Sequence, residues 1–143
     1  MIILDTNVLS ELFRPVPATQ VEAWMSSLPG DTVFFTTVGE AELKRGVAEL
    51  PEGKRRTRLS EAIDCVLEED LRGRVLPFGR DAAHSYSIIA AERRAAGRPI
   101  GQFDCQIAAI ARSHGGTLAT RNTSDFEGCG IPLINPWDWE APA

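Results

Sequence analysis

The chain has 143 residues, of which 43% are apolar and 24% charged, so it can bury one ordinary core, and we expect a single domain over residues 1–143. The formal net charge of −5 argues against a protein that grips long nucleic acid through a broad positive surface, but it leaves room for local basic patches and for acidic groups that bind a cation. No apolar run approaches the roughly 20 residues that span a bilayer, and no basic segment precedes one, so we expect a cytoplasmic protein without membrane contact.

Apolar spacing along the chain alternates between strand and helix patterns. In chain order it predicts a strand at 2–4, helices at 8–13 and 21–28, a strand at 33–35, helices at 37–50 and 59–73, a strand at 75–78, helices at 81–96 and 103–114, and strands at 117–119 and 131–134. Thr37 is the expected N-cap of the third helix, with Glu40 completing a capping box. The alternation predicts an α/β fold with a mostly parallel central sheet of about five strands, flanked by helices on both faces.

Three carboxylates occupy positions where such folds gather ligands. Asp5 follows the first strand, Glu42 lies early in the helix after the second strand, and Asp104 begins an otherwise very apolar helix. The strand at 117–119 is followed by further polar groups, namely Thr120, Asn122 and Asp125. If the first and fourth strands are neighbours, as in doubly wound sheets, all these groups converge on the carboxyl rim of the sheet.

Each of the three acids also has a purely structural interpretation. Asp5 can cap the helix that follows it, Glu42 can face solvent as a good helix former, and Asp104 can be favoured by the helix dipole. Taken one at a time, these alternatives stay open. The combination favours a metal site, because clustered like charges repel one another unless a cation joins them.

An acidic cluster with oxygen ligands only favours a hard divalent ion, Mg²⁺ or Mn²⁺, which commonly binds a few carboxylates together with a substrate phosphate. Such an ion lowers the pKa of a bound water and stabilises charge on a leaving oxygen. The chemistry that this cluster supports is hydrolysis of a phosphodiester bond.

Several segments of the chain occur together in one known family. They are residues 2–11 (IILDTNVLSE), 41–47 (AELKRGV), 104–109 (DCQIAA), and 119–122 (ATRN) with 135–137 (NPW). On these motifs, which follow in order over essentially the whole chain, the sequence resembles the PIN-domain proteins. Within that group it is similar to the VapC-type toxins, and most nearly to their FitB-like branch.

This resemblance implies a PIN-like fold and a function. The implied protein is an endoribonuclease that depends on Mg²⁺ or Mn²⁺ and is the toxin of a VapBC-type, type II toxin–antitoxin pair. The implied partners are an RNA substrate, a VapB-type antitoxin and a second copy of the chain in a homodimer. Operator DNA would be contacted only indirectly, through the antitoxin.

The resemblance also assigns residues by position. It implies that catalysis and metal binding belong to Asp5, Glu42 and Asp104. It implies that supporting polar roles belong to Thr6, Asn7 and Thr120. The family often has a fourth acid where this chain has Asn122, so we expect either Asn122 or Asp125 to take that place.

Basic residues near the acids are candidates for binding substrate phosphate. Lys44 and Arg45 lie within a turn of Glu42, and Arg121 shares the rim with Thr120. Each can reach a phosphate or pair with a carboxylate. The densest basic run, at 54–58, favours a solvated helix start, because short charge clusters usually face water, and an RNA contact is the alternative.

Two other functions compete with the nuclease. A phosphatase with an aspartate nucleophile would share the first strand and Asp5, but it requires a second aspartate where this chain has Asn7. A catalytically weak or inactive PIN module, acting only through its antitoxin and operator DNA, is favoured by Asn122.

Overall fold

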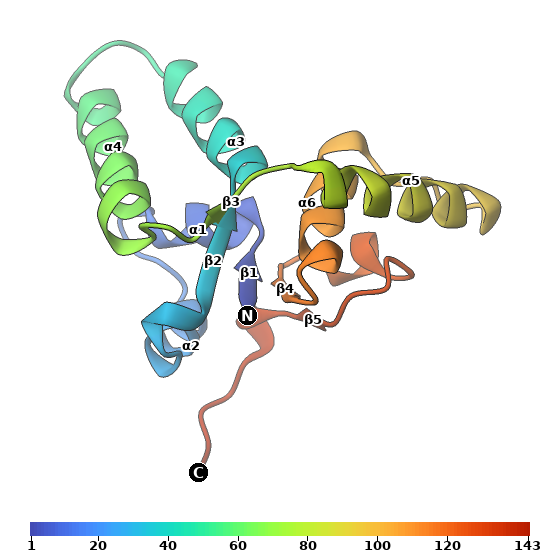
Figure 1. The fold of residues 1–143 in the computed structure, drawn as a ribbon. Coiled ribbons are helices and arrows are strands. Elements are labelled where there is room, and N and C mark those ends of the chain that lie inside the picture. The colour runs from blue at the N-terminus through green and yellow to red at the C-terminus, as the bar shows by residue number, and fades with distance from the viewer.

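A parallel sheet of five strands, in the order β3-β2-β1-β4-β5, runs through the centre of the molecule (Figure 1). The structure, a computed structural model, describes residues 1–143. The strands are β1 (Ile2–Leu4), β2 (Val33–Thr36), β3 (Val75–Leu76), β4 (Thr117–Ala119) and β5 (Leu133–Ile134). Every neighbouring pair is parallel, and β1 lies between β2 and β4, as expected for a doubly wound sheet.

Helices cover both faces of this sheet. They are α1 (Thr6–Leu12), α2 (Thr19–Ser27), α3 (Thr37–Ala48), α4 (Lys54–Cys65), α5 (Arg80–Ala95) and α6 (Gln102–Ser113). Short helical segments complete the chain: η1 (Gly30–Thr32), η2 (Val66–Asp70), η3 (Thr123–Phe126) and η4 (Pro136–Asp138). No helix is both long enough and apolar enough to cross a membrane.

Alternating strand residues divide the interior into two cores. Leu4 and Phe35 point into the core shared with α1, α2, α3 and α4, whereas Ile3 and Leu118 point into the core shared with α5 and α6. All four side chains are almost completely buried. The predicted α/β fold, with a parallel sheet and helices on both faces, is therefore confirmed.

The prediction that Thr37 caps α3 is wrong, because the preceding residue does so. The Thr36 side chain accepts the N–H of Gly39 at 3.0 Å, and Thr37 is the first helical residue. Glu40, assigned to a capping box, instead accepts from Lys44 at 2.9 Å. Since Thr36 is also the last residue of β2, the strand runs directly into the helix that carries Glu42.

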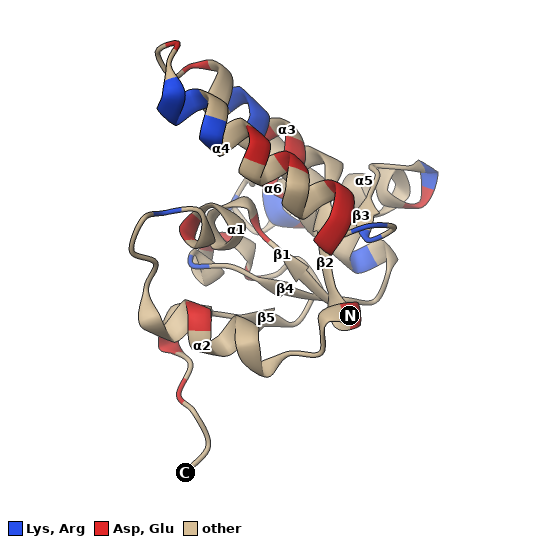
Figure 2. Ribbon diagram, turned by 90° about the vertical axis from the view of Figure 1, so that its left-hand side faces the viewer, with Lys and Arg blue, Asp and Glu red and all other residues tan.

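Helices α3 and α4 form a hairpin that projects from the sheet (Figure 1). The charge of this hairpin changes along α4. Lys and Arg gather at the outer end of the hairpin, where α4 begins, whereas the charged residues in the rest of α4 and in η2 are mostly Asp and Glu (Figure 2). The outer end therefore presents positive charge on a chain whose net charge is negative.

Candidate active site

The site lies at the carboxyl ends of β1 and β4, where the strand order reverses. Asp5 follows β1 and Thr120 follows β4, and the N–H of Asp5 donates to the carbonyl of Ala119 at 2.8 Å. In open α/β sheets the crevice at such a reversal is where ligands bind. The prediction that β1 and β4 are neighbours, on which the convergence of the acidic groups depended, is confirmed.

Asp5 is buried and held by three neighbours. One carboxylate oxygen accepts the N–H of Thr6 at 2.8 Å, so Asp5 does cap α1. The other oxygen accepts the Thr120 hydroxyl at 2.7 Å and the Asn7 side-chain amide at 3.3 Å. Capping and a site role are thus compatible, because Thr120 fixes the oxygen that the cap leaves free.

The environment of Asp5 works against its negative charge. Burial raises the pKa of Asp5 to about 6, hydrogen bonds from Thr120 and Thr6 oppose that rise, and the charges of Asp104 and Glu42 add to it. Both of those acids therefore lie close enough to act on Asp5 electrostatically. A cation placed among them would relieve the repulsion.

Asp104 lies in the first turn of α6 and is half-buried. Burial raises the pKa of Asp104, as do the negative charges of Asp125 and then Glu42, whereas the guanidinium of Arg93 lowers it. Of these acids, Asp125 exerts the larger effect on Asp104. Asp125 thus brings negative charge to Asp104 from η3, the short helix that follows β4.

Glu42 reaches the site from α3 and is tied to α1. Its carboxylate accepts the hydroxyl of Thr6 at 2.9 Å. Thr6 therefore contacts two of the three acids, since its N–H donates to Asp5 and its side-chain hydroxyl donates to Glu42. A short hydroxyl side chain directly after Asp5 thus links the start of α1 to the acid on α3.

The acids fit a divalent ion only with water as a further ligand. Their donor atoms are all oxygen, which suits Mg²⁺ or Mn²⁺. No three His, Cys, Asp or Glu side chains stand close enough together to form a complete metal cage. Mg²⁺ commonly binds one or two carboxylates and keeps several waters, so an incomplete set of protein ligands is compatible with this ion.

Asn7 and the segment after β4 surround Thr120. The Asn7 amide donates weakly to the Thr120 hydroxyl at 3.4 Å, and its carbonyl oxygen accepts the N–H of Arg121 at 3.3 Å. The N–H of Asn122 donates to the same hydroxyl at 3.1 Å. Asn122 itself is exposed, so its backbone rather than its side chain is engaged with the site.

The predicted basic residues differ in where they lie. Arg45 lines a hollow together with Glu42, but its guanidinium also pairs with Glu49 at 2.9 Å. Lys44 pairs with Glu40 and lines a different hollow on the far side of the α3–α4 hairpin, one that does not include Glu42. The guanidinium of Arg121 lies 4.9 Å from the ring centre of Trp137.

Arg93 is a residue of the site region that the sequence motifs do not indicate. It is only 6% exposed, and its guanidinium donates to the carbonyls of Asp125 at 2.7 Å, Glu127 at 3.0 Å and Arg98 at 2.7 Å. It therefore ties α5 to the segment that carries Asp125. One signal was available: Arg93 continues the apolar stripe of α5 four residues after Ile89, where a cation is out of place.

Comparison with known proteins shows the family to which this fold belongs. The PIN-domain family model matches residues 2–128. The chain is 44% identical to the VapC ribonuclease Y4jK of Sinorhizobium fredii and 39% identical to the toxin FitB of Neisseria gonorrhoeae, each over 96% of this chain and 99% of the relative. The structure of FitAB bound to an IR36 DNA fragment matches with a TM-score of 0.93 at 38% identity, over 99% of each chain.

This chain therefore belongs to the PIN-domain family. Within the family it groups with the VapC- and FitB-type proteins, and the resemblance inferred from its motifs is confirmed.

Proposed function

We propose that this chain is a metal-dependent endoribonuclease, the toxin of a VapBC-type toxin–antitoxin pair, and that residues 1–143 form its single PIN domain. The observation that supports the proposal is the linkage of Asp5 to both neighbouring elements: Asp5 accepts the hydroxyl of Thr120 after β4, and the adjacent Thr6 donates to Glu42 of α3. The charges of Asp104 and Glu42 add to the rise that burial causes in the pKa of Asp5. Membership of the PIN family and relatives named as a VapC ribonuclease and a toxin support the reaction.

In this proposal Asp5 and Asp104 hold Mg²⁺ or Mn²⁺, and Glu42 binds it directly or through water. When bound, the ion supplies an activated water and stabilises negative charge on the leaving oxygen. Glu42 orients the attacking water or accepts its proton. Thr120 and Thr6 fix the carboxylates of Asp5 and Glu42 by donating their hydroxyl hydrogens.

The fourth acidic position is proposed for Asp125 rather than Asn122. The negative charge of Asp125 acts on Asp104, whereas the side chain of Asn122 carries no charge and makes no hydrogen bond. Asp125→Asn should then lower the rate of RNA cleavage, and the wild-type chain should cleave RNA without an acid at position 122.

An inactive PIN module is the second candidate function, and the presence of Asn122 in place of an acid favours it. This alternative predicts no metal-dependent cleavage of RNA.

The partners follow from the same family. FitB has been solved as part of the FitAB complex bound to DNA. By analogy, we propose that an antitoxin holds this chain, that the antitoxin contacts operator DNA, and that the chain forms a homodimer. The net charge of −5 argues against a broad positive surface with which the chain itself would bind operator DNA.

Cleavage of RNA by the purified chain tests the proposed function. We expect cleavage with Mg²⁺ or Mn²⁺, none with a chelator, and a loss of at least about a hundredfold in Asp5→Asn and Asp104→Asn, since each removes a charge that holds the ion. Asp31→Asn, an exposed acid that precedes β2, is the matched control and should cut at the wild-type rate. Undiminished cleavage by both site variants would refute the assignment.

A further inference from the structure

Two hollows meet at Glu42, one on each side of α3. The first, of ≈ 470 Å³, lies between α3 and the start of α6 and includes Phe103 and Arg45. The second, of ≈ 1040 Å³, lies between α1, α3 and α4 and includes Thr6 and the basic start of α4. Glu42 and Gly46 line both of them. An extended polymer could therefore pass from one hollow to the other past Glu42, the one proposed catalytic acid that lines them.

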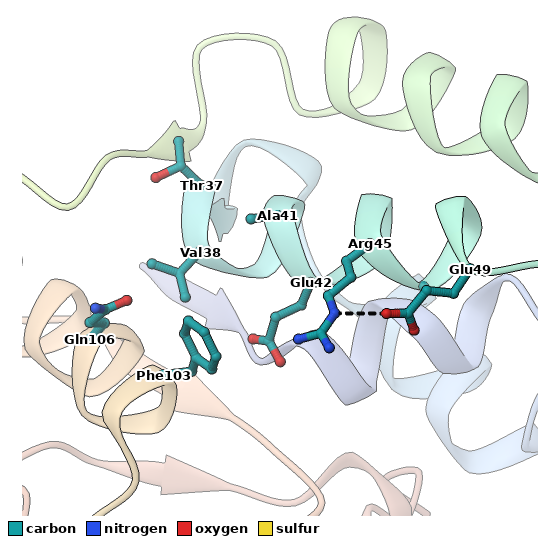
Figure 3. A pocket seen from close by; sticks show the side chains of 9 residues that line it. Thr37, Val38, Ala41, Glu42, Arg45, Glu49, Phe103 and Gln106 are labelled. Carbon is teal, nitrogen blue, oxygen red and sulfur yellow. Dashed lines mark hydrogen bonds and ion pairs between the residues drawn. The ribbon is translucent and has the colours of Figure 1, made fainter.

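The first hollow presents an aromatic face. Phe103 is 54% exposed although it is large and apolar, and it directly precedes Asp104. Figure 3 shows its ring rising from α6 toward α3, beside Val38 and Glu42. Single-stranded nucleic acids are commonly bound by stacking their bases on such exposed rings.

The second hollow presents unpaired positive charge. Lys54, Arg55 and Arg58 line it, and Arg58 follows Lys54 by four residues and Arg55 by three, the spacings that bring helical side chains side by side. None of the three takes part in an ion pair. Cations in the first turns weaken a helix rather than stabilise it, so helix stability does not explain them. Positive charge beside an acidic site suits a phosphate backbone.

Gly46 stands between the two hollows, one turn after Glu42 on the same face of α3. A methyl group at this position would meet nothing within 4 Å, so no neighbour requires a glycine there. Glycine inside a helix is unfavourable compared with alanine. The absent side chain instead leaves the passage between the hollows open.

We propose that a single RNA strand crosses the site along this path. A base next to the reacting phosphate stacks on Phe103, the strand passes Glu42 at Gly46, and phosphates further along lie against Lys54, Arg55 and Arg58. This inference rests on the proposed ribonuclease function and adds the route of the substrate to it.

Binding of a labelled single-stranded RNA oligonucleotide tests the path, with every variant made in the full chain carrying Asp104→Asn so that the RNA survives. Phe103→Ala should weaken binding about tenfold and Phe103→Tyr should retain it, because stacking needs an aromatic face. Phe78→Ala is the control, since that exposed ring packs against Tyr86 and lines neither hollow.

The salt dependence of the same binding isolates the basic groove. Each lost phosphate contact reduces the slope of log K against log salt by about 0.7 for a single strand, so Arg55→Gln with Arg58→Gln should reduce it by about 1.4. Arg72→Gln with Arg94→Gln removes the same charge from exposed positions outside both hollows and should leave the slope unchanged.

Gly46→Leu separates the path from folding. Leucine is the better helix former and its Cβ meets open space, so the midpoint of thermal unfolding should rise while RNA affinity falls several-fold. The path would be overturned if the Phe103, Arg55/Arg58 and Gly46 variants all kept the RNA affinity and salt slope of the wild-type residues. It would also be overturned if these variants lost binding to the antitoxin but not to RNA. Cleavage judges the proposed function separately, because a chain that cuts no RNA fails that test whatever the binding series shows.

Discussion

At the scale of single residues, the site combines acids whose ionisation is opposed with hydroxyls that hold them in place. Asp5 is the clearest case. Its folded pKa is about 6 against 3.8 in an unfolded chain, so between these pH values the folded chain holds a proton that the unfolded chain has lost. The free energy of unfolding therefore falls as the pH rises from 4 to 6.

Asp5→Asn should remove this pH dependence and raise the free energy of unfolding at pH 7 by about 1–3 kcal/mol in the absence of metal. Near pH 4 the two chains should be about equally stable. Urea unfolding followed by circular dichroism at both pH values measures the difference. A variant that is less stable than the wild type at pH 7 would show that the ionised Asp5 stabilises the fold, contrary to this account.

Arg93 acts through the segment that it anchors. Arg93→Met leaves the carbonyls of Asp125 and Glu127 without their donor, and we expect a loss of about 2–4 kcal/mol in the free energy of unfolding. Arg94→Met is the control. The side chain of Arg94 is exposed, so this substitution should change the free energy of unfolding by less than about 0.5 kcal/mol. Equal stabilities of the two variants in urea would contradict the anchoring role.

At the scale of elements, α3 determines where Glu42 lies. Its start is fixed by the Thr36 cap and by the close approach of Gly39 to the ring of Phe35, where a methyl group would come within 2.5 Å of a ring carbon. The beginning of the helix is therefore packed directly against the buried end of β2.

Gly39→Ala should consequently lower the free energy of unfolding by about 1–3 kcal/mol, since Phe35 is fully buried and must shift. Gly46→Ala in the same helix provides the matched comparison. It meets open space and should stabilise the chain by up to about 1 kcal/mol. Thermal unfolding of both variants measures the contrast, and a change of the same sign in both would argue against the packing interpretation.

The sequence predicted the elements of this fold better than their ends. Strands at 2–4 and 117–119 were predicted with their observed bounds, because an apolar run is followed at once by a polar residue. The helix predicted at 59–73 actually begins at Lys54 and ends in η2, since its first turn carries no apolar periodicity. The third strand was predicted to 78 but ends at Leu76, because Pro77 cannot donate to a sheet.

At the scale of the whole molecule, the parallel sheet brings together residues that are far apart in sequence. Thr120 contacts Asp5 although the two are 115 positions apart. This contact could be predicted only by assuming that the first and fourth strands are neighbours in the sheet. The buried position of Arg93 and the hollows on either side of α3 could not be predicted in this way, because they depend on how helices pack on the sheet rather than on any local pattern.

The proposed reaction requires Asp5 and Asp104 to share one divalent ion. A crystal structure of the chain soaked in Mg²⁺ tests it most directly. We predict an ion at the rim between β1 and β4, with an oxygen of each aspartate at about 2.0–2.1 Å and waters completing its octahedron. A structure in which the ion binds elsewhere, or in which the two carboxylates do not share it, would rule out this metal site.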